Sequence, residues 1–117
     1  MNVLVVDDSR AIKLLVSNYL LNAGFAYEHA SNGEEALKIV STNPSFDLIL
    51  VDWEMPGMSG IELVEKIKKL GHNFKIMMIT SKNTPNSIKQ ARDSGVTAYL
   101  LKPFSESDLI DKITSIS

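Results

Sequence analysis

The chain alternates five short apolar runs with stretches in which apolar residues recur at helical spacing. The apolar runs predict strands at residues 2–6, 27–30, 47–51, 75–79 and 98–101. The first, third and fourth runs are nearly continuous in Val, Leu, Ile and Met, which is typical of strands that helices cover on both faces. The second run is more polar, as expected of a strand at the edge of a sheet. The pattern therefore predicts a parallel sheet.

A helical pattern follows each predicted strand. The inward-facing residues are expected to be Ile12, Leu15, Val16, Tyr19 and Leu20, then Ala36, Leu37 and Val40, then Leu63, Ile67 and Leu70, then Ile88 and Ala91, and finally Leu109, Ile113 and Ile116. Ser31 with Glu34, and Ser59 with Glu62, have the spacing of capping boxes. Pro85 predicts the start of the fourth helix. That helix has the fewest apolar residues, so we expect it to pack weakly.

Five repeats of strand and helix predict an α/β fold, a doubly wound five-stranded parallel sheet flanked by five helices. Right-handed crossovers put helices on both faces, and the common order for five such strands is 2-1-3-4-5. This order places strands 2–6 and 47–51 side by side, and ligands bind beyond the carboxyl ends of strands at such a switch point. The 117 residues fit one domain, residues 1–117, and leave no room for a second.

Composition narrows the range of functions. The net charge of −2 gives no basic surface for nucleic acid or an anionic membrane, so we expect neither as a direct partner. The absence of cysteine excludes disulfides, zinc–thiolate sites and thiol catalysis. No apolar run approaches the roughly 20 residues of a spanning helix, and no signal-peptide pattern is present, so a cytoplasmic location is expected.

Chemically active side chains follow four of the predicted strands. Asp7 and Asp8 come after the first strand, Asp52 after the third, Thr80 after the fourth and Lys102 after the fifth. Three carboxylates that converge at neighbouring strand ends repel one another unless a cation lies among them. Hard oxygen ligands with open water positions suit Mg²⁺, with Mn²⁺ as an alternative. The sequence therefore predicts a metal site at this edge of the sheet.

The same residues have the chemistry of phosphoryl transfer. A carboxylate such as Asp52 can be a nucleophile and form an aspartyl phosphate, while Lys102 supplies positive charge and Thr80 a hydroxyl donor. Taken singly, each has an ordinary interpretation: an aspartate after a strand is more often a cap or turn residue, and a lysine is usually solvated. The combination at successive strand ends favours the functional interpretation.

Four segments carry a family resemblance. LVVDDSR (4–10), LILVDWEMPGMSGIELV (48–64), IMMITS (76–81) and AYLLKPF (98–104) resemble the receiver domains of two-component response regulators, across essentially the whole chain. The resemblance implies that Asp52 is phosphorylated from the phosphohistidine of a sensor histidine kinase or phosphotransfer protein. It also implies that Asp8, Asp52 and the backbone carbonyl of Glu54 bind Mg²⁺ directly, with Asp7 acting through water.

The resemblance further implies how a signal leaves the site. Lys102 and Thr80 would hold the phosphoryl group, Thr80 would move toward it, and Tyr99 would rotate inward, with a cis Lys102–Pro103 bond. The expected output surface for a downstream protein comprises the helix from Pro85, strand 98–101 and the last helix. Such a chain is a phosphoacceptor switch that promotes its own phosphorylation and dephosphorylation, rather than an enzyme. Stand-alone receivers of this family most often serve chemotaxis or act as relay carriers, and chemotaxis is the pathway favoured here. The alternative is a receiver excised from a larger multidomain regulator.

Two charged residues near the acceptor prompt a separate hypothesis. Glu54 lies two residues after Asp52, and Lys82 two after Thr80. We expect a salt bridge between Glu54 and Lys82, over the route by which water attacks the aspartyl phosphate, to tune the phosphoryl lifetime. The ordinary alternative is two exposed side chains that contribute little to stability.

Three rival functions fit the sequence less well. Dinucleotide and flavin binders need a glycine-rich turn after the first strand, where this chain has Asp-Asp-Ser-Arg. A small aspartyl phosphatase would place its nucleophile after the first strand and usually needs a cap over the site. A receiver that serves only as an interaction module is disfavoured because every expected site residue is present.

Overall fold

The sheet lies between two helical layers, with all five strands parallel. The computed structural model describes residues 1–43, 45–71 and 73–117. Within them the chain runs β1 (Asn2–Val6), α1 (Arg10–Asn22), β2 (Ala26–Ala30), α2 (Gly33–Thr42), β3 (Leu48–Asp52), α3 (Gly60–Lys69), β4 (Lys75–Thr80), α4 (Pro85–Ser94), β5 (Ala98–Leu101) and α5 (Glu106–Ile116). The strand order is β2-β1-β3-β4-β5. The predicted doubly wound fold and strand order are confirmed.

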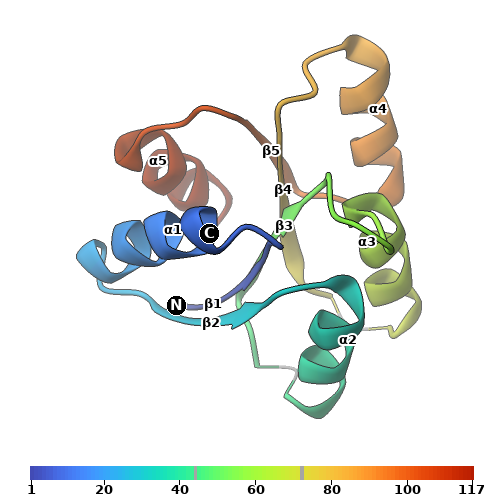
Figure 1. Ribbon diagram of the computed structural model, residues 1–117, viewed down its shortest axis with the longest axis horizontal. Helices are drawn as coiled ribbons and strands as arrows, with labels where there is room; N and C mark the ends of the chain where they lie inside the picture. The colour runs from blue at the N-terminus through green and yellow to red at the C-terminus, as the bar shows by residue number, and fades with distance from the viewer. Residues whose placement is uncertain (44, 72) are drawn as a thin grey trace.

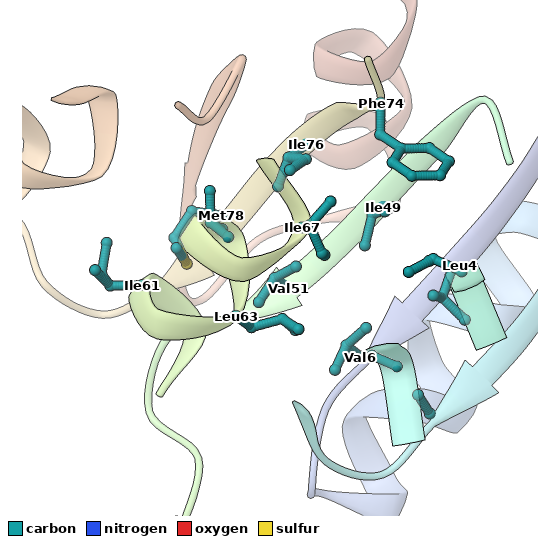
Figure 2. Packing of buried hydrophobic residues seen from close by; sticks show 14 of the residues in the cluster. Leu4, Val6, Ile49, Val51, Ile61, Leu63, Ile67, Phe74, Ile76 and Met78 are labelled. Atoms are coloured by element: carbon teal, nitrogen blue, oxygen red, sulfur yellow. The ribbon is translucent and has the colours of Figure 1, made fainter. Parts of the chain in front are cut away.

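Alternating residues of the central strands fill the two cores. On β3, Ile49 and Val51 pack with the inward faces of α2 and α3, whereas Leu48 and Leu50 pack with those of α1 and α5. Figure 1 shows α1 and α5 on one side of the sheet and α2, α3 and α4 on the other. In Figure 2, Leu63 and Ile67 of α3 lie over the strands, in the core that also contains Ile49 and Val51. Burial on both faces explains why these strands are continuous apolar runs.

Three helix predictions need correction. Leu15 and Leu70 were expected to face inward, yet they are 38% and 43% exposed. Leu70 is the C-cap of α3, beyond the last helical turn. Helix α2 is capped by Asn32, whose side chain accepts from the Glu35 N–H at 2.8 Å, and not by Ser31. The Ser31 hydroxyl instead accepts a hydrogen bond from Lys13 Nζ.

Other helix signals behaved as expected. Ser59 caps α3 and Thr84 caps α4, which begins at Pro85. Helix α4 buries only Ala91 fully, which agrees with the expected weak packing. In the described parts of the chain, no helix is both long enough and apolar enough to span a membrane.

Strand boundaries differ from the prediction by one residue in places. β2 begins at Ala26, and β3 and β4 extend to Asp52 and Thr80. Asp52 pairs with Ile79, and Thr80 with Leu101, so both polar residues belong to the sheet itself. Ladder hydrogen bonds therefore fix the backbone beneath the two side chains.

Candidate functional site

Asp7, Asp8 and Asp52 form one cluster at the carboxyl ends of β1 and β3. One carboxylate oxygen from each lies within 4.8 Å of the others. Asp7 and Asp52 are buried, at 2% and 4% exposure, whereas Asp8 is exposed. The Ser9 N–H donates to Asp7 Oδ1 at 2.8 Å, which orients that carboxylate at the start of α1. The structure thus brings together the three acids predicted from the sequence.

Burial and the negative charge of neighbouring acids raise the pKa values of two of these acids, Asp52 and Asp7. Burial, followed by the negative charge of Asp7, raises the pKa of Asp52 to about 6, although Lys102 acts in the opposite direction. Burial also raises the pKa of Asp7, with a smaller contribution from Asp8, against the hydrogen bond from the Ser9 N–H. Carboxylates that are costly to ionise side by side favour a divalent cation, and a set of oxygen donors fits Mg²⁺.

Lys102 contacts the candidate acceptor directly. Its Nζ lies 3.1 Å from Asp52 Oδ1, and this is the ion pair found within the described residues. The backbone N–H of Lys102 donates to the Thr80 carbonyl at 2.9 Å, which fixes the lysine backbone beside β4. The peptide bond between Lys102 and Pro103 is cis, as the resemblance implied. The side chain is 27% exposed, so its ammonium group also reaches solvent beside the acids. The Lys102 ammonium group is therefore close enough to Asp52 to contact the oxygens of a phosphoryl group bound there.

Thr80 is the last residue of β4, and its hydroxyl both donates and accepts a hydrogen bond. The residue is 0% exposed, its Oγ1 donates to Glu54 Oε1 at 2.7 Å, and it accepts from the Lys82 N–H at 3.1 Å. The expected salt bridge between Glu54 and Lys82 is wrong. The Glu54 carboxylate is held by the Thr80 hydroxyl, while Lys82 Nζ lies 5.3 Å from the centre of the Trp53 ring, in a cation–π arrangement.

Tyr99 connects β5 to the same loop. Its hydroxyl donates to the Lys82 carbonyl at 2.8 Å, and its ring meets that of Trp53 edge-on, with centroids 6.3 Å apart. Burial and the charge of Glu54 raise the pKa of Tyr99. The contacts of Trp53 with both Lys82 and Tyr99 were not predicted from the sequence. The position of Trp53 next to Asp52 was the available signal.

Gly60, the first residue of α3, lies directly beneath the acceptor Asp52. A Cβ at Gly60 would lie 2.5 Å from the Asp52 carbonyl oxygen and 2.7 Å from Trp53 Cα. The Gly60 N–H donates to the Trp53 carbonyl at 2.9 Å. The start of α3 is thus packed directly against the backbone of the acceptor strand, and only glycine permits this approach.

Comparisons with known proteins agree with this site. The sequence model of the response regulator receiver domain matches residues 3–114, so the chain belongs to that family. The chain is 35% identical over 120 residues to chemotaxis protein CheY-3 of Vibrio cholerae, with 99% of this chain and 91% of that protein covered. It is 31% identical over 111 residues to sporulation initiation phosphotransferase F of Bacillus subtilis, covering 95% of this chain and 89% of that protein.

A solved structure agrees as well. The CheX–CheY–BeF₃–Mg complex from Borrelia burgdorferi contains a chain that superposes with a TM-score of 0.93 at 27% identity, covering 99% of this chain and 88% of that one. The resemblance to receiver domains found in the sequence is confirmed, and the protein is a receiver domain of phosphorelay signalling. Receiver domains of the CheY type are signalling switches, and none of the rival functions is favoured.

Proposed function

We propose that Asp52 accepts a phosphoryl group from the phosphohistidine of a sensor histidine kinase or phosphotransfer protein. The nitrogen–phosphorus bond breaks with its electron pair returning to the donor imidazole, while a bond forms between phosphorus and a carboxylate oxygen of Asp52. The observation that carries this proposal is the buried Asp52 carboxylate between an acid cluster and the ammonium group of Lys102, 3.1 Å away.

The chain's own residues would divide the work. Asp8, Asp52 and the backbone carbonyl of Glu54 would hold Mg²⁺ or Mn²⁺, with Asp7 assisting through water; the bound cation would offset negative charge on phosphoryl oxygens. Lys102, which already contacts Asp52, would also contact those oxygens, because a phosphoryl group on Asp52 gives its positive charge a second partner. Thr80 would donate its hydroxyl to them.

The proposed output surface comprises α4, β5 and α5. Helix α4 is held by few buried side chains, and a shallow pocket of about 190 Å³ between α4 and β5 is lined by Ile88, Arg92, Val96, Thr97, Ala98 and Tyr99. Because Tyr99 borders this pocket and binds the loop that follows Thr80, a change at Thr80 would reach the surface through Tyr99. A downstream protein would read the shift in population between two arrangements.

The proposed function includes a cellular location, a pathway and control of the phosphoryl lifetime. We place the protein in the cytoplasm and favour chemotaxis as its pathway, with CheY-3 as the supporting relative. The domain would promote its own phosphorylation and dephosphorylation, and Glu54 and Lys82 would tune the phosphoryl lifetime from their separate positions. If neutralising both left the dephosphorylation rate unchanged, the tuning role would be excluded. Multiple turnover on phosphoesters would instead favour a phosphatase.

Trp53 provides the test, because it is buried beside Asp52 and contacts both Tyr99 and Lys82. Its fluorescence should change when Mg²⁺ is added and change again with beryllofluoride, a phosphoryl mimic. Asp52→Asn should abolish the second response. A flat trace in both titrations of the unaltered protein would contradict the proposal.

A further inference from the structure

The Thr80 hydroxyl has no free proton to offer in this structure. A hydroxyl donates one hydrogen bond, and Thr80 Oγ1 donates it to Glu54 Oε1 at 2.7 Å. The acceptor is a carboxylate, so the bond is charge-assisted and stronger than a bond between neutral groups. Because Thr80 is completely buried, water does not compete for the same proton. Any other anion that needs this hydroxyl must first displace Glu54.

The Glu54 side chain can leave the Thr80 hydroxyl without disturbing its surroundings. Its backbone neighbour Trp53 is fixed, since the Trp53 N–H donates to the Ile79 carbonyl at 3.1 Å. The Glu54 residue itself is exposed, so its carboxylate regains water when it releases Thr80. The side chain can therefore move without disturbing the acceptor strand.

The hydrogen bond between Thr80 and Glu54 is also part of a longer series of contacts that reaches Tyr99. The Lys82 N–H donates to Thr80 Oγ1, and the Lys82 carbonyl accepts from the Tyr99 hydroxyl. Tyr99 packs on Trp53, which adjoins Glu54, so these contacts close into a ring. The rotamer of Thr80 is thus tied at once to the acceptor loop and to β5.

We propose that Glu54 is an internal anion, which holds the Thr80 hydroxyl in the resting state and competes with the phosphoryl group for it. This contact, the Glu54–Thr80 latch, is autoinhibitory: it sets how strongly a phosphoryl group on Asp52 must interact before Thr80 and Tyr99 rearrange. The inference rests on the proposed function of Asp52 and adds a regulatory role for a side chain whose backbone carbonyl is the expected metal ligand. It differs from lifetime tuning because it acts before phosphorylation.

The first test uses the protein without metal or phosphoryl mimic. Three-bond couplings measured by NMR report the χ1 rotamer of Thr80, which should be single in the unaltered protein. Glu54→Gln retains a carbonyl acceptor and should keep that rotamer, whereas Glu54→Ala should give a mixture. Glu65→Ala, which removes an exposed glutamate on α3, is the matched control and should change nothing. A single, unchanged rotamer in Glu54→Ala would overturn the latch.

The second test separates the latch from simple charge repulsion. Glu54→Ala removes a negative charge near Asp52, and this alone should tighten beryllofluoride binding. The same substitution is therefore made in a Thr80→Val background, where no latch can form. We expect the gain in apparent affinity, measured by Trp53 fluorescence at saturating Mg²⁺, to be about fivefold larger with Thr80 than with Val at this position.

The outcomes are distinct. Equal gains in the two backgrounds would show that only charge matters and would overturn the latch. No beryllofluoride response in the unaltered protein would instead contradict the proposed function of Asp52, and the rotamer measurement, which needs no mimic, would still decide the latch. Circular dichroism of Thr80→Val checks that the buried substitution leaves the fold intact.

Discussion

Lys102 Nζ and Asp52 Oδ1 lie 3.1 Å apart, in a protein whose Asp52 carboxyl has a pKa raised to about 6. The lysine is the main influence that lowers this pKa against burial and the charge of Asp7. The ion pair therefore helps to keep Asp52 mostly ionised near neutral pH, as a nucleophilic carboxylate must be.

Removing the lysine should raise the pKa of Asp52 further. In Lys102→Met we expect the titration of the Asp52 carboxyl carbon, followed by NMR in metal-free buffer, to shift to higher pH than in the unaltered protein. Lys89→Met, a change on the exposed side of α4, is the control and should leave the titration in place. An unchanged or lowered pKa in Lys102→Met would show that the ion pair does not govern Asp52.

The raised pKa of Asp52 also predicts how stability depends on pH. The ordinary value is 3.8 and the folded value is about 6, so between these pH values the folded state binds more protons than the unfolded state. The free energy of unfolding should therefore fall as pH rises from 4 to 6, by up to about 2–3 kcal/mol from this group.

Chemical denaturation across that pH window, in the presence of a chelator, measures the effect. Asp52→Asn should remove most of the decline and be the more stable protein at neutral pH. Parallel pH profiles for the two proteins would contradict the assignment of the raised pKa to Asp52.

Two glycines that begin helices form a matched pair for testing the packing beneath the acceptor. A Cβ at Gly60 meets the backbone of Asp52 and Trp53, whereas a Cβ at Gly33 meets only the side chain of Met58, 2.5 Å from its sulfur. Backbone cannot move aside as a methionine side chain can. Gly60→Ala should cost about 1–3 kcal/mol of unfolding free energy and weaken the Mg²⁺ response of Trp53.

Gly33→Ala should cost less, because Met58 can adopt another rotamer, and it should leave the Mg²⁺ response unaltered. Urea denaturation and the fluorescence titration supply both readouts. Equal costs for the two substitutions would mean that the close approach at Gly60 is not the constraint described.

His29 on β2 predicts a pH effect of opposite sign. The Ser17 hydroxyl donates to the Lys13 carbonyl at 2.6 Å, so His29 Nε2 must donate to Ser17 Oγ, as a neutral imidazole can. Burial and the charge of Lys13 lower the pKa of His29 from its ordinary value of 6.5. The unfolded state therefore takes up the proton first, and this contribution to stability is present above pH 6.5 and lost as pH falls through the folded-state pKa.

His29→Gln removes the titrating group while keeping an N–H donor. The stability advantage of the unaltered protein over this variant should shrink between pH 7.5 and pH 5.5, as measured by urea denaturation. An advantage that is constant over this range would show that His29 does not titrate differently in the two states.

The fold could be predicted because strands buried on both faces are continuous apolar runs, which are easily seen in the sequence. Helical periodicity marks the middle of an apolar face better than its edges, which is why Leu15 and Leu70 were misplaced. The cap of α2 was misassigned because Ser31–Glu34 and Asn32–Glu35 share one spacing, and only the tertiary contact between Lys13 and Ser31 separates them.

The site was predictable to the level of backbone positions. Parallel strands bring their carboxyl ends together, so Asp7, Asp8, Asp52, Thr80 and Lys102 had to be neighbours. The partners of flexible side chains did not follow from position. Glu54 and Lys82 have opposite charges on facing loops, yet a buried hydroxyl and an aromatic face provide better contacts than a solvated ion pair.

The most direct test of the central claim is the mass of the intact protein after incubation with a small acyl phosphate and Mg²⁺. We predict the addition of one phosphoryl group, absent in Asp52→Asn and suppressed when a chelator removes the metal. Peptide mapping should place the group on Asp52. No gain in mass, or a gain that persists in Asp52→Asn, would contradict the account.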